Sequence, residues 1–369
     1  MMYLLIFIVL GIFGILNLVW LPKEQAYLKD IGLISSFFIL VLFAGLRYQT
    51  GPDWKDYNDF FSGIAPLYDY GQTSIAIRDV LEPGFVFLCS LFKAVINNNQ
   101  FVFLGLAAVS LSFFFSRIKE YSAFPLISIL CFYIYGYSGN FSILRQVMAI
   151  SIFFWAVKYI VNRNPFAYYG AVILAFLFHT SAIILLPLYF VINIRWSGKL
   201  IMFFFLIAII LYQFDIVSQL FSYLLSSVGG LARYSDYLTN QLLSKPKLLG
   251  TLFLERMLIF VLLFYKRNGF EKQYKYFNVF FNIYIIYILC YLVFSQVLVL
   301  LRFIEYFTYA SCILYPLLLL YFKESYGRYI VYMFLFIILF FRGYTSLVLD
   351  GKEANVHSRY LPYRSIIEN

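Results

Sequence analysis

The stretch from residue 46 to 61, LRYQTGPDWKDYNDFF, gathers charged and aromatic side chains directly after an apolar run. It holds two basic residues, three aspartates and five aromatic rings, in a chain that is only 12% charged and 63% hydrophobic. Aromatic rings can pack on the C–H faces of a sugar, while carboxylates such as Asp53 accept hydrogen bonds from sugar hydroxyls. The same rings would suit an aromatic belt at a membrane interface, so composition leaves both interpretations open.

Three other groups of polar residues interrupt apolar runs. They are Asn140, Arg145 and Gln146 at the start of one run, His179 inside another, and Arg302 with Glu305 at the start of a third. Ionisable groups within membrane segments are costly and usually serve a function. The guanidinium fork of an arginine fits phosphate oxygens, and a helix start adds a positive dipole end. As alternatives, Arg145 could reach lipid headgroups and Arg302 could pair with Glu305.

His179 is one of only two histidines. As a neutral imidazole it could act as a general base toward a hydroxyl, or it could bond a neighbouring carbonyl and hold a break in the chain. The four cysteines lie far apart, without CxxC or Cys/His spacing, and no dense carboxylate cluster or glycine-rich phosphate loop is present. We therefore expect no metal and no cofactor.

Composition predicts the elements that must position these groups. A mean hydropathy of +0.83 over 369 residues exceeds what one soluble core can use. We predict an all-α polytopic integral membrane protein, with about 11–12 transmembrane helices plus re-entrant or interfacial segments. Its first segment, near 2–20, is expected to be a retained helix, because no basic leader or small-residue cleavage site accompanies it. The net charge of +10 is scattered singly between apolar runs, so we predict no nucleic-acid partner.

The basic residues predict an orientation. Together with Lys158, six short connections hold 14 of the 28 Lys and Arg residues: 22–30, 117–120, 162–164, 193–199, 266–275 and 323–328. The positive-inside rule places them in the cytoplasm. Residues 1–369 then form a single polytopic membrane domain with outer loops at 47–82 and 215–249 and an outer tail at 349–369.

This orientation constrains how often the chain crosses the membrane. Residues 83–116 must hold one full crossing plus a partial or interfacial helix. Residues 166–192 must turn back within the membrane, with the break at His179, Thr180 and Ser181, and such a break is tolerated only beside protein or a cavity. The polar groups at 47–82, 140–146, 179 and 302–305 then share the outer face, which suggests one polar cavity there.

Five motifs in order along the chain resemble those of a known family. They are Arg47 with Gly51, Asp53, Trp54 and Tyr57; Asn140 with Arg145, Gln146 and Ala149; His179 with Ser181 and Ala182; Arg302 with Tyr306 and Phe307; and Tyr360 with Pro362 and Tyr363. This pattern resembles the EpsG-type polysaccharide polymerases, of the broad Wzy class of O-antigen and capsule polymerases. Trp54 stands where the family more often has tyrosine.

The resemblance implies a multi-pass enzyme of the bacterial inner membrane with a GT-C-like helical fold. Such enzymes join oligosaccharide repeat units carried on undecaprenyl diphosphate, which serve as donor and acceptor, at the periplasmic or outer face. Besides membrane lipid, a partner protein that controls chain length often accompanies them.

A mechanism follows from charge once the resemblance is accepted. An acceptor hydroxyl attacks the donor's anomeric carbon, and undecaprenyl diphosphate leaves against preorganised cations. We expect the following roles: diphosphate binding by Arg145, Arg302 and Arg47; a base or orienting acceptor at His179 or Asp53; and substrate positioning by Asn140, Gln146, Ser181 and Tyr306.

Three other function classes fit the sequence less well. A flippase for lipid-linked oligosaccharides would also present a basic cavity, but we expect it to show internal repeats, and none is evident. A sugar O-acyltransferase would need an acyl donor from the cytoplasm, whereas His179 is placed outside. A non-catalytic scaffold does not explain arginines within the membrane.

Overall fold

The computed structural model describes residues 1–19, 22–227, 250–294, 297–346 and 360–368. In these ranges the chain is helical and has no strand, apart from isolated bridge pairing such as that of Arg47 with Ser365. Helices are expected here, because apolar segments in lipid must satisfy their backbone groups internally. The predicted all-α class is confirmed.

The chain divides into two compact units, Met1–Leu186 with Ser311–Asn369, and Pro187–Ala310, which we call the first and second units. The first unit contains α1 (Met2–Ile15), α2 (Tyr27–Gly45), α3 (Trp54–Ser62), α4 (Ile75–Val80), α5 (Pro83–Val95), α6 (Asn99–Tyr121), α7 (Pro125–Tyr135), α8 (Gly139–Ser142), α9 (Leu144–Val161), α10 (Pro165–Phe176), the 3₁₀ segments η3 (Thr180–Leu185) and η5 (Tyr315–Tyr321), and α19 (Ser325–Tyr344). The second contains α11 (Leu188–Val191), α12 (Gly198–Gln213), α13 (Ile216–Ser227), α15 (Thr251–Tyr265), α16 (Arg267–Gln273), α17 (Phe277–Phe294) and the start of α18 (Leu298–Leu314).

Six segments among the described residues are long and apolar enough to cross a membrane: Lys23–Gly45, Asn99–Tyr121, Leu144–Val161, Phe277–Phe294, Leu300–Tyr321 and Ser325–Tyr344. The bent pair Gly198–Gln213 and Ile216–Tyr223 would add a seventh. The chain is therefore an integral membrane protein. The larger estimate of 11–12 counted apolar runs, and several of those runs form helices too short to cross alone, such as α1 and α7.

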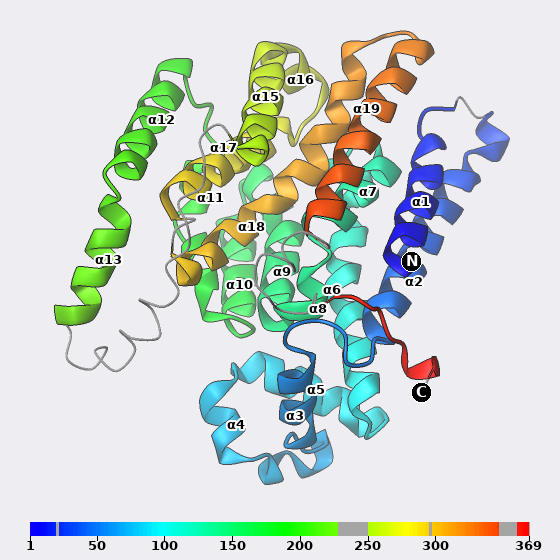
Figure 1. Ribbon diagram of the computed structural model, residues 1–369, viewed down its shortest axis with the longest axis vertical. Coiled ribbons are helices and arrows are strands. Elements are labelled where there is room, and N and C mark those ends of the chain that lie inside the picture. Colours follow the sequence, from blue (N-terminus) through cyan, green and yellow to red (C-terminus); the bar gives the residue numbers. More distant parts are fainter. Residues whose placement is uncertain (20–21, 228–249, 295–296, 347–359, 369) are drawn as a thin grey trace. The chain divides into compact units, whose positions relative to one another are not determined.

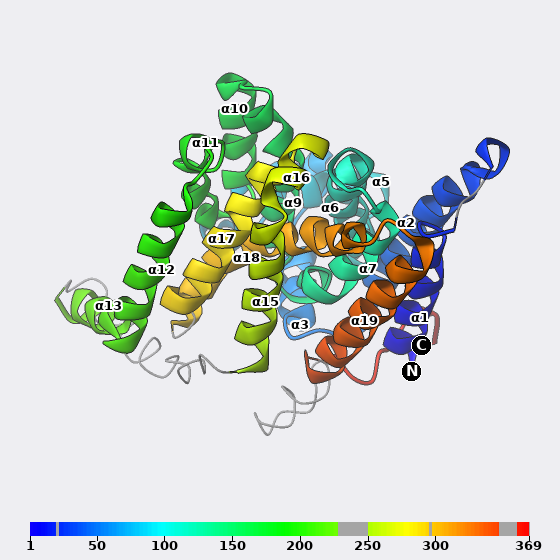
Figure 2. The ribbon, with the colours of Figure 1, turned by 90° about the horizontal axis from the view of Figure 1, so that it is seen from above.

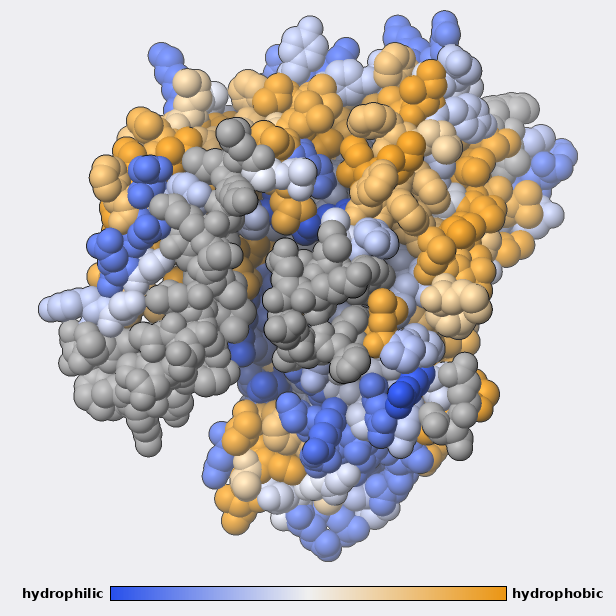
Figure 3. All heavy atoms as spheres, viewed as in Figure 1, coloured by the Kyte–Doolittle hydropathy of each residue, from blue (hydrophilic) through white to orange (hydrophobic). Residues whose placement is uncertain are grey.

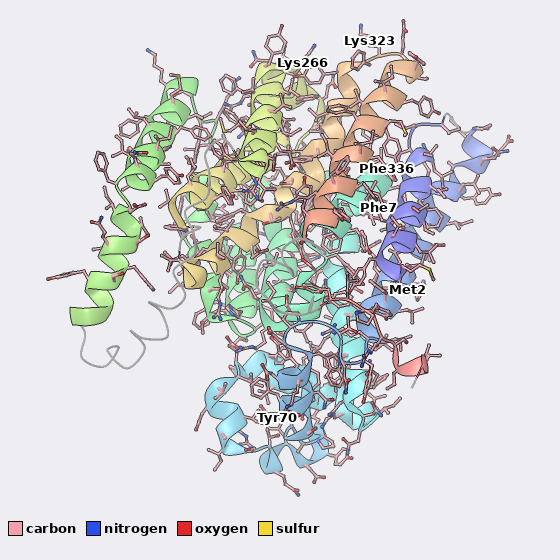
Figure 4. All side chains as sticks on the ribbon, viewed as in Figure 1. Met2, Phe7, Tyr70, Lys266, Lys323 and Phe336 are labelled. Atoms are coloured by element: carbon pink, nitrogen blue, oxygen red, sulfur yellow. The ribbon has the colours of Figure 1, made fainter. Side chains whose placement is uncertain are left out.

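The first unit has two distinct ends, because α2 and α6 run antiparallel. At one end the Gln100 side chain donates a hydrogen bond to the Gly45 carbonyl, and at the other Lys119 pairs with Asp30. We call these the Arg47 end and the Lys119 end. In Figure 4, Tyr70 of the 47–82 connection and Lys323 lie at opposite ends of this unit. The assignment of these loops to the cytoplasmic and outer faces stays a prediction.

The helix α5 does not cross from one end to the other. Near its C-terminus, Lys93 donates hydrogen bonds to the carbonyls of Phe61 and Ile64, which belong to the 47–82 connection that also leads into its first residue. The α6 helix, with 23 residues, then makes the full crossing. The prediction of one crossing plus a partial helix in 83–116 is confirmed.

A hairpin surrounds His179. The buried Tyr168 hydroxyl donates a hydrogen bond to the Leu185 carbonyl at 2.7 Å, so η3 returns alongside α10. With 12 residues, α10 spans about 18 Å, less than the ~30 Å hydrocarbon core. His179 itself is extended, with φ −159°. The predicted break is found at this residue.

The break lies against the start of α5. The Gly84 amide donates to the Leu177 carbonyl at 2.9 Å, and a Cβ added at Gly84 would lie 2.8 Å from that oxygen. Only a glycine lets the two backbones approach so closely. This contact brings the 47–82 connection and the His179 hairpin together.

In the second unit, the two connections at 193–199 and 266–275 meet. Arg267 donates to the Trp196 carbonyl at 2.6 Å and to Asn278 Oδ1 at 2.9 Å, and it pairs with Glu271 at 2.7 Å. The basic residues of both connections predict that they lie on the same, cytoplasmic face. Residues 228–249 of the expected outer loop 215–249, and 349–359 of the tail, lie outside the described residues.

The outward surface of the first unit is apolar over α1 and α19, which lie side by side (Figures 1 and 2). Phe7 and Phe336 join them, with ring centroids 4.6 Å apart. Hydrophobic side chains cover this face in Figure 3, whereas hydrophilic ones gather over the 47–82 connection. Such an apolar belt suits contact with lipid.

The Gly84 contact generates a stability prediction. Gly84→Ala should cost about 1–3 kcal/mol, because the new methyl group forces apart two backbones that have no room to move. The measurement is the thermal unfolding midpoint of the purified protein in detergent. Gly170→Ala is the matched control, because Gly170 is also helical but its Cβ would meet nothing within 4 Å. A Gly84 variant as stable as the Gly170 variant would contradict the close contact.

Candidate active site

The Arg47 side chain is completely buried at the Arg47 end of the first unit. Its guanidinium carbon lies 4.7 Å and 5.1 Å from the ring centroids of Phe103 and Phe141. Nη1 donates to the Ala44 carbonyl at 2.9 Å and to the Asn140 carbonyl. Burial lowers the pKa of Arg47 to about 10, so the group is still charged at neutral pH.

The backbone around Arg47 joins three parts of the chain. Its carbonyl accepts hydrogen bonds from Trp54 Nε1 at 3.3 Å and from Gln100 at 3.2 Å. The last described residues pack onto the same place, where Tyr48 N donates to the Arg364 carbonyl at 2.9 Å and the Tyr363 ring stacks on Phe43. The first and last family motifs therefore meet, and Arg47 has no exposed surface to offer a diphosphate.

The rings of the 46–61 stretch do not form exposed platforms. Trp54, Tyr57 and Phe61 are buried, and Phe61 lies edge-on to Phe103 of α6 with centroids 4.8 Å apart. The α3 helix is amphipathic, so its aspartates at 56 and 59 face outward instead. The expected arrangement of rings on a hydrated surface is corrected, because the rings supply the packing that fixes α3.

A charged cluster lies where α3, α5, α9 and η3 meet. Arg145 Nη1 is 2.8 Å from Glu82 Oε2, and the side chains are 24% and 11% exposed. The other oxygen of Glu82 accepts a hydrogen bond from the Thr180 amide at 3.4 Å. The Tyr57 side chain lies close enough to the Arg145 guanidinium for the two to interact electrostatically. We call Tyr57, Glu82, Arg145 and Thr180 the Glu82 cluster.

Tyr57 carries a neutral hydroxyl in this cluster. Burial raises the pKa of Tyr57, while the Arg145 guanidinium offsets part of the effect and the Asp53 carboxylate adds to it. Asp53 stands four residues before Tyr57, so the two share one face of α3. The structure thus brings Asp53 and Arg145, two of the predicted site residues, into one neighbourhood.

His179 caps η3 beside this cluster. Its Nδ1 accepts a hydrogen bond from the Ser181 amide at 3.2 Å and lies 2.5 Å from Ser181 Oγ. A neutral ring whose Nδ1 accepts the amide bond carries its proton on Nε2. In this tautomer Nε2 donates a hydrogen bond and does not take up a proton.

Other predicted site residues are placed differently. Asn140 is buried and accepts from Ser110 Oγ at 2.9 Å, so it supports Arg47, and Gln146 is buried within α9. Arg302 is exposed on α18 and Tyr306 is buried one turn later, both in the second unit. Both residues belong to a different unit from the Glu82 cluster, so their roles in the site stay predictions.

Glu82 was missed by reasoning from sequence. It stands in Glu82-Pro83-Gly84, at the junction of the polar connection and an apolar run, and that position is the signal that could have indicated it. Within the described ranges, no group of three or more His, Cys, Asp or Glu is placed to hold a metal. The absence of a metal stays a prediction.

The fold and this site define a helical, multi-pass membrane protein with a charged cluster at one end of its first unit. The chain belongs to the EpsG family, whose model matches residues 31–365. No curated protein and no solved structure matches it significantly. Membership confirms the resemblance and supports, in general terms, a role as a polysaccharide polymerase of the glycosyltransferase type.

The burial of Arg47 generates a second prediction. Arg47→Lys should lower stability by about 2 kcal/mol or more, because an ammonium cannot bond both carbonyls while lying flat between two rings. Arg78→Lys is the control, since Arg78 also donates to two carbonyls and lies over Tyr70, but is exposed. Thermal unfolding in detergent compares the two, and equal midpoints would contradict the structural role.

Proposed function

We propose that this protein polymerises undecaprenyl-diphosphate-linked oligosaccharide repeat units at the outer face of the bacterial inner membrane. An acceptor hydroxyl attacks the anomeric carbon of the donor glycan, and undecaprenyl diphosphate leaves. The donor is already activated by its diphosphate, so no sugar nucleotide takes part. Direct displacement inverts the anomeric configuration. Membership of the EpsG family supports the reaction class.

The partly exposed Arg145 is the observation that carries the proposal. It opens a membrane-spanning helix beside the His179 break, where a lipid diphosphate at the membrane surface can reach it. The Arg145 side chain is 24% exposed, so part of it is accessible to a ligand. A fixed cation placed where the leaving group gains charge lowers the barrier.

The remaining roles follow from burial. The diphosphate-binding role of Arg302, which is exposed in the second unit, stays a proposal from the sequence. Arg47 is proposed to hold the 47–82 connection in place, and Asn140 to hold Arg47. His179 and Ser181 shape the break beside the proposed substrate site. A membrane lipid environment and a partner that controls chain length complete the proposal.

A substitution in cells tests the reaction. Arg145→Ala should abolish long glycan chains and leave single repeat units on the carrier lipid at the outer face, because the leaving diphosphate loses its cation. The control is Arg163→Ala, at the opposite end of the same helix pair. Gel profiles of the extracted glycan measure chain length. A normal ladder from stable Arg145→Ala protein would contradict the proposal, and repeat units held at the cytoplasmic face would indicate a flippase.

The proposed orientation can be tested by labelling single cysteines. Thr180→Cys should react with an impermeant maleimide in intact cells, whereas Lys323→Cys should react only after the membrane is opened. Both positions are exposed and belong to the first unit. The only described native cysteine that is not buried, Cys290, is replaced by serine beforehand. The reverse labelling pattern would place the site in the cytoplasm and contradict the proposal.

A further inference from the structure

Glu82 is an acidic side chain for which the proposed reaction has no role so far. It is nearly buried, its Oε2 is bound by Arg145 and its Oε1 by the Thr180 amide. Each carboxylate oxygen has two lone pairs, so one on each oxygen remains beyond these bonds. The Glu82 side chain is 11% exposed, the Arg145 side chain is 24% exposed, and the two are 2.8 Å apart, so a substrate that touches one is close to the other.

We infer that Glu82 is the catalytic base that accepts the proton of the attacking sugar hydroxyl. This inference rests on the proposed function and deepens it, because it names the proton acceptor. The sequence left that role to His179 or Asp53. The His179 tautomer set by Ser181 donates from Nε2, and using Nδ1 as a base would break the cap of η3. Among the described residues, the acid that pairs with Arg145 is Glu82.

The step balances in atoms and charge. The acceptor O–H bond breaks, its oxygen forms a bond to the anomeric carbon, and the proton moves to the Glu82 carboxylate. The bond from the anomeric carbon to the diphosphate oxygen breaks, and its electron pair stays with the diphosphate. One negative charge is lost at Glu82 while one is gained on the leaving group.

Arg145 couples these two charges. In the structure its guanidinium is paired with the Glu82 carboxylate at 2.8 Å. As the diphosphate gains charge, the same guanidinium can turn its fork toward the phosphate oxygens. A carboxylate that loses its counter-charge and gains an anionic neighbour binds a proton more tightly. Departure of the diphosphate therefore draws the guanidinium away from the Glu82 carboxylate at the moment that the proton must leave the hydroxyl.

The test uses full-length protein in lipid nanodiscs with purified lipid-linked repeat units. Glu82→Gln keeps an acceptor oxygen for Arg145 but cannot take a proton. We expect kcat to fall by about 10²–10⁴-fold while KM for the lipid-linked unit changes less than about threefold. Asp69→Asn, an exposed acid on the same connection, is the matched control and should retain wild-type kcat.

A second variant separates proton transfer from a structural ion pair. Glu82→Ala should regain at least about tenfold in turnover with formate, which is a base, but not with chloride at the same concentration, which fills the anion position without accepting a proton. Equal rescue by both anions, no rescue of folded protein, or a Glu82→Gln kcat within about fivefold of wild type would overturn the inference. Wild-type protein that elongates nothing would instead overturn the proposed function.

Discussion

The guanidinium of Arg47, buried between two rings, is the interaction on which the rest of the first unit depends. Within the described residues, the Nη1 group of this buried charge donates to carbonyls at the end of α2 and in α8, while Nε and Nη2 make no hydrogen bond and the guanidinium lies against the two rings. Both chain segments are thereby fixed at one point. The 47–82 connection begins at this point, so its position depends on the Arg47 contacts. The positions of Tyr57 and Glu82, which this connection contributes to the Glu82 cluster, depend on them too.

Arg47 and Arg145, both in the first unit, show how burial separates a structural role from a binding role within one chain. Arg47 is enclosed and bonded to the backbone, so its charge organises the fold. Arg145 keeps exposed surface and pairs with a side chain, so its charge can be shared with a ligand. An arginine held by backbone carbonyls has partners whose charge does not change. An arginine paired with a carboxylate can change partners when that carboxylate binds a proton or when a phosphate gains charge nearby.

Sequence reasoning predicted the class and the break at His179, because hydropathy is set by the membrane and acts on each segment separately. It did not predict that Trp54 and Tyr57 pack inward, since an aromatic ring at an interface suits water, lipid or protein equally. It also missed Glu82. Glu82 is recognised as a site residue only by its pairing with Arg145, which lies 63 positions further along the chain. No local sequence pattern predicts such a pairing.

The packing of the final residues against the start of the 47–82 connection sets an order of events during biosynthesis. The hydrogen bonds of Thr50 with Arg364 and of Tyr363 with Phe43 join positions 314 and 320 residues apart. A nascent chain therefore inserts most of its helices before these contacts can form. The contacts at the Arg47 end therefore form only after translation has passed the last motif, later than the contacts among residues 57–180 that build the Glu82 cluster.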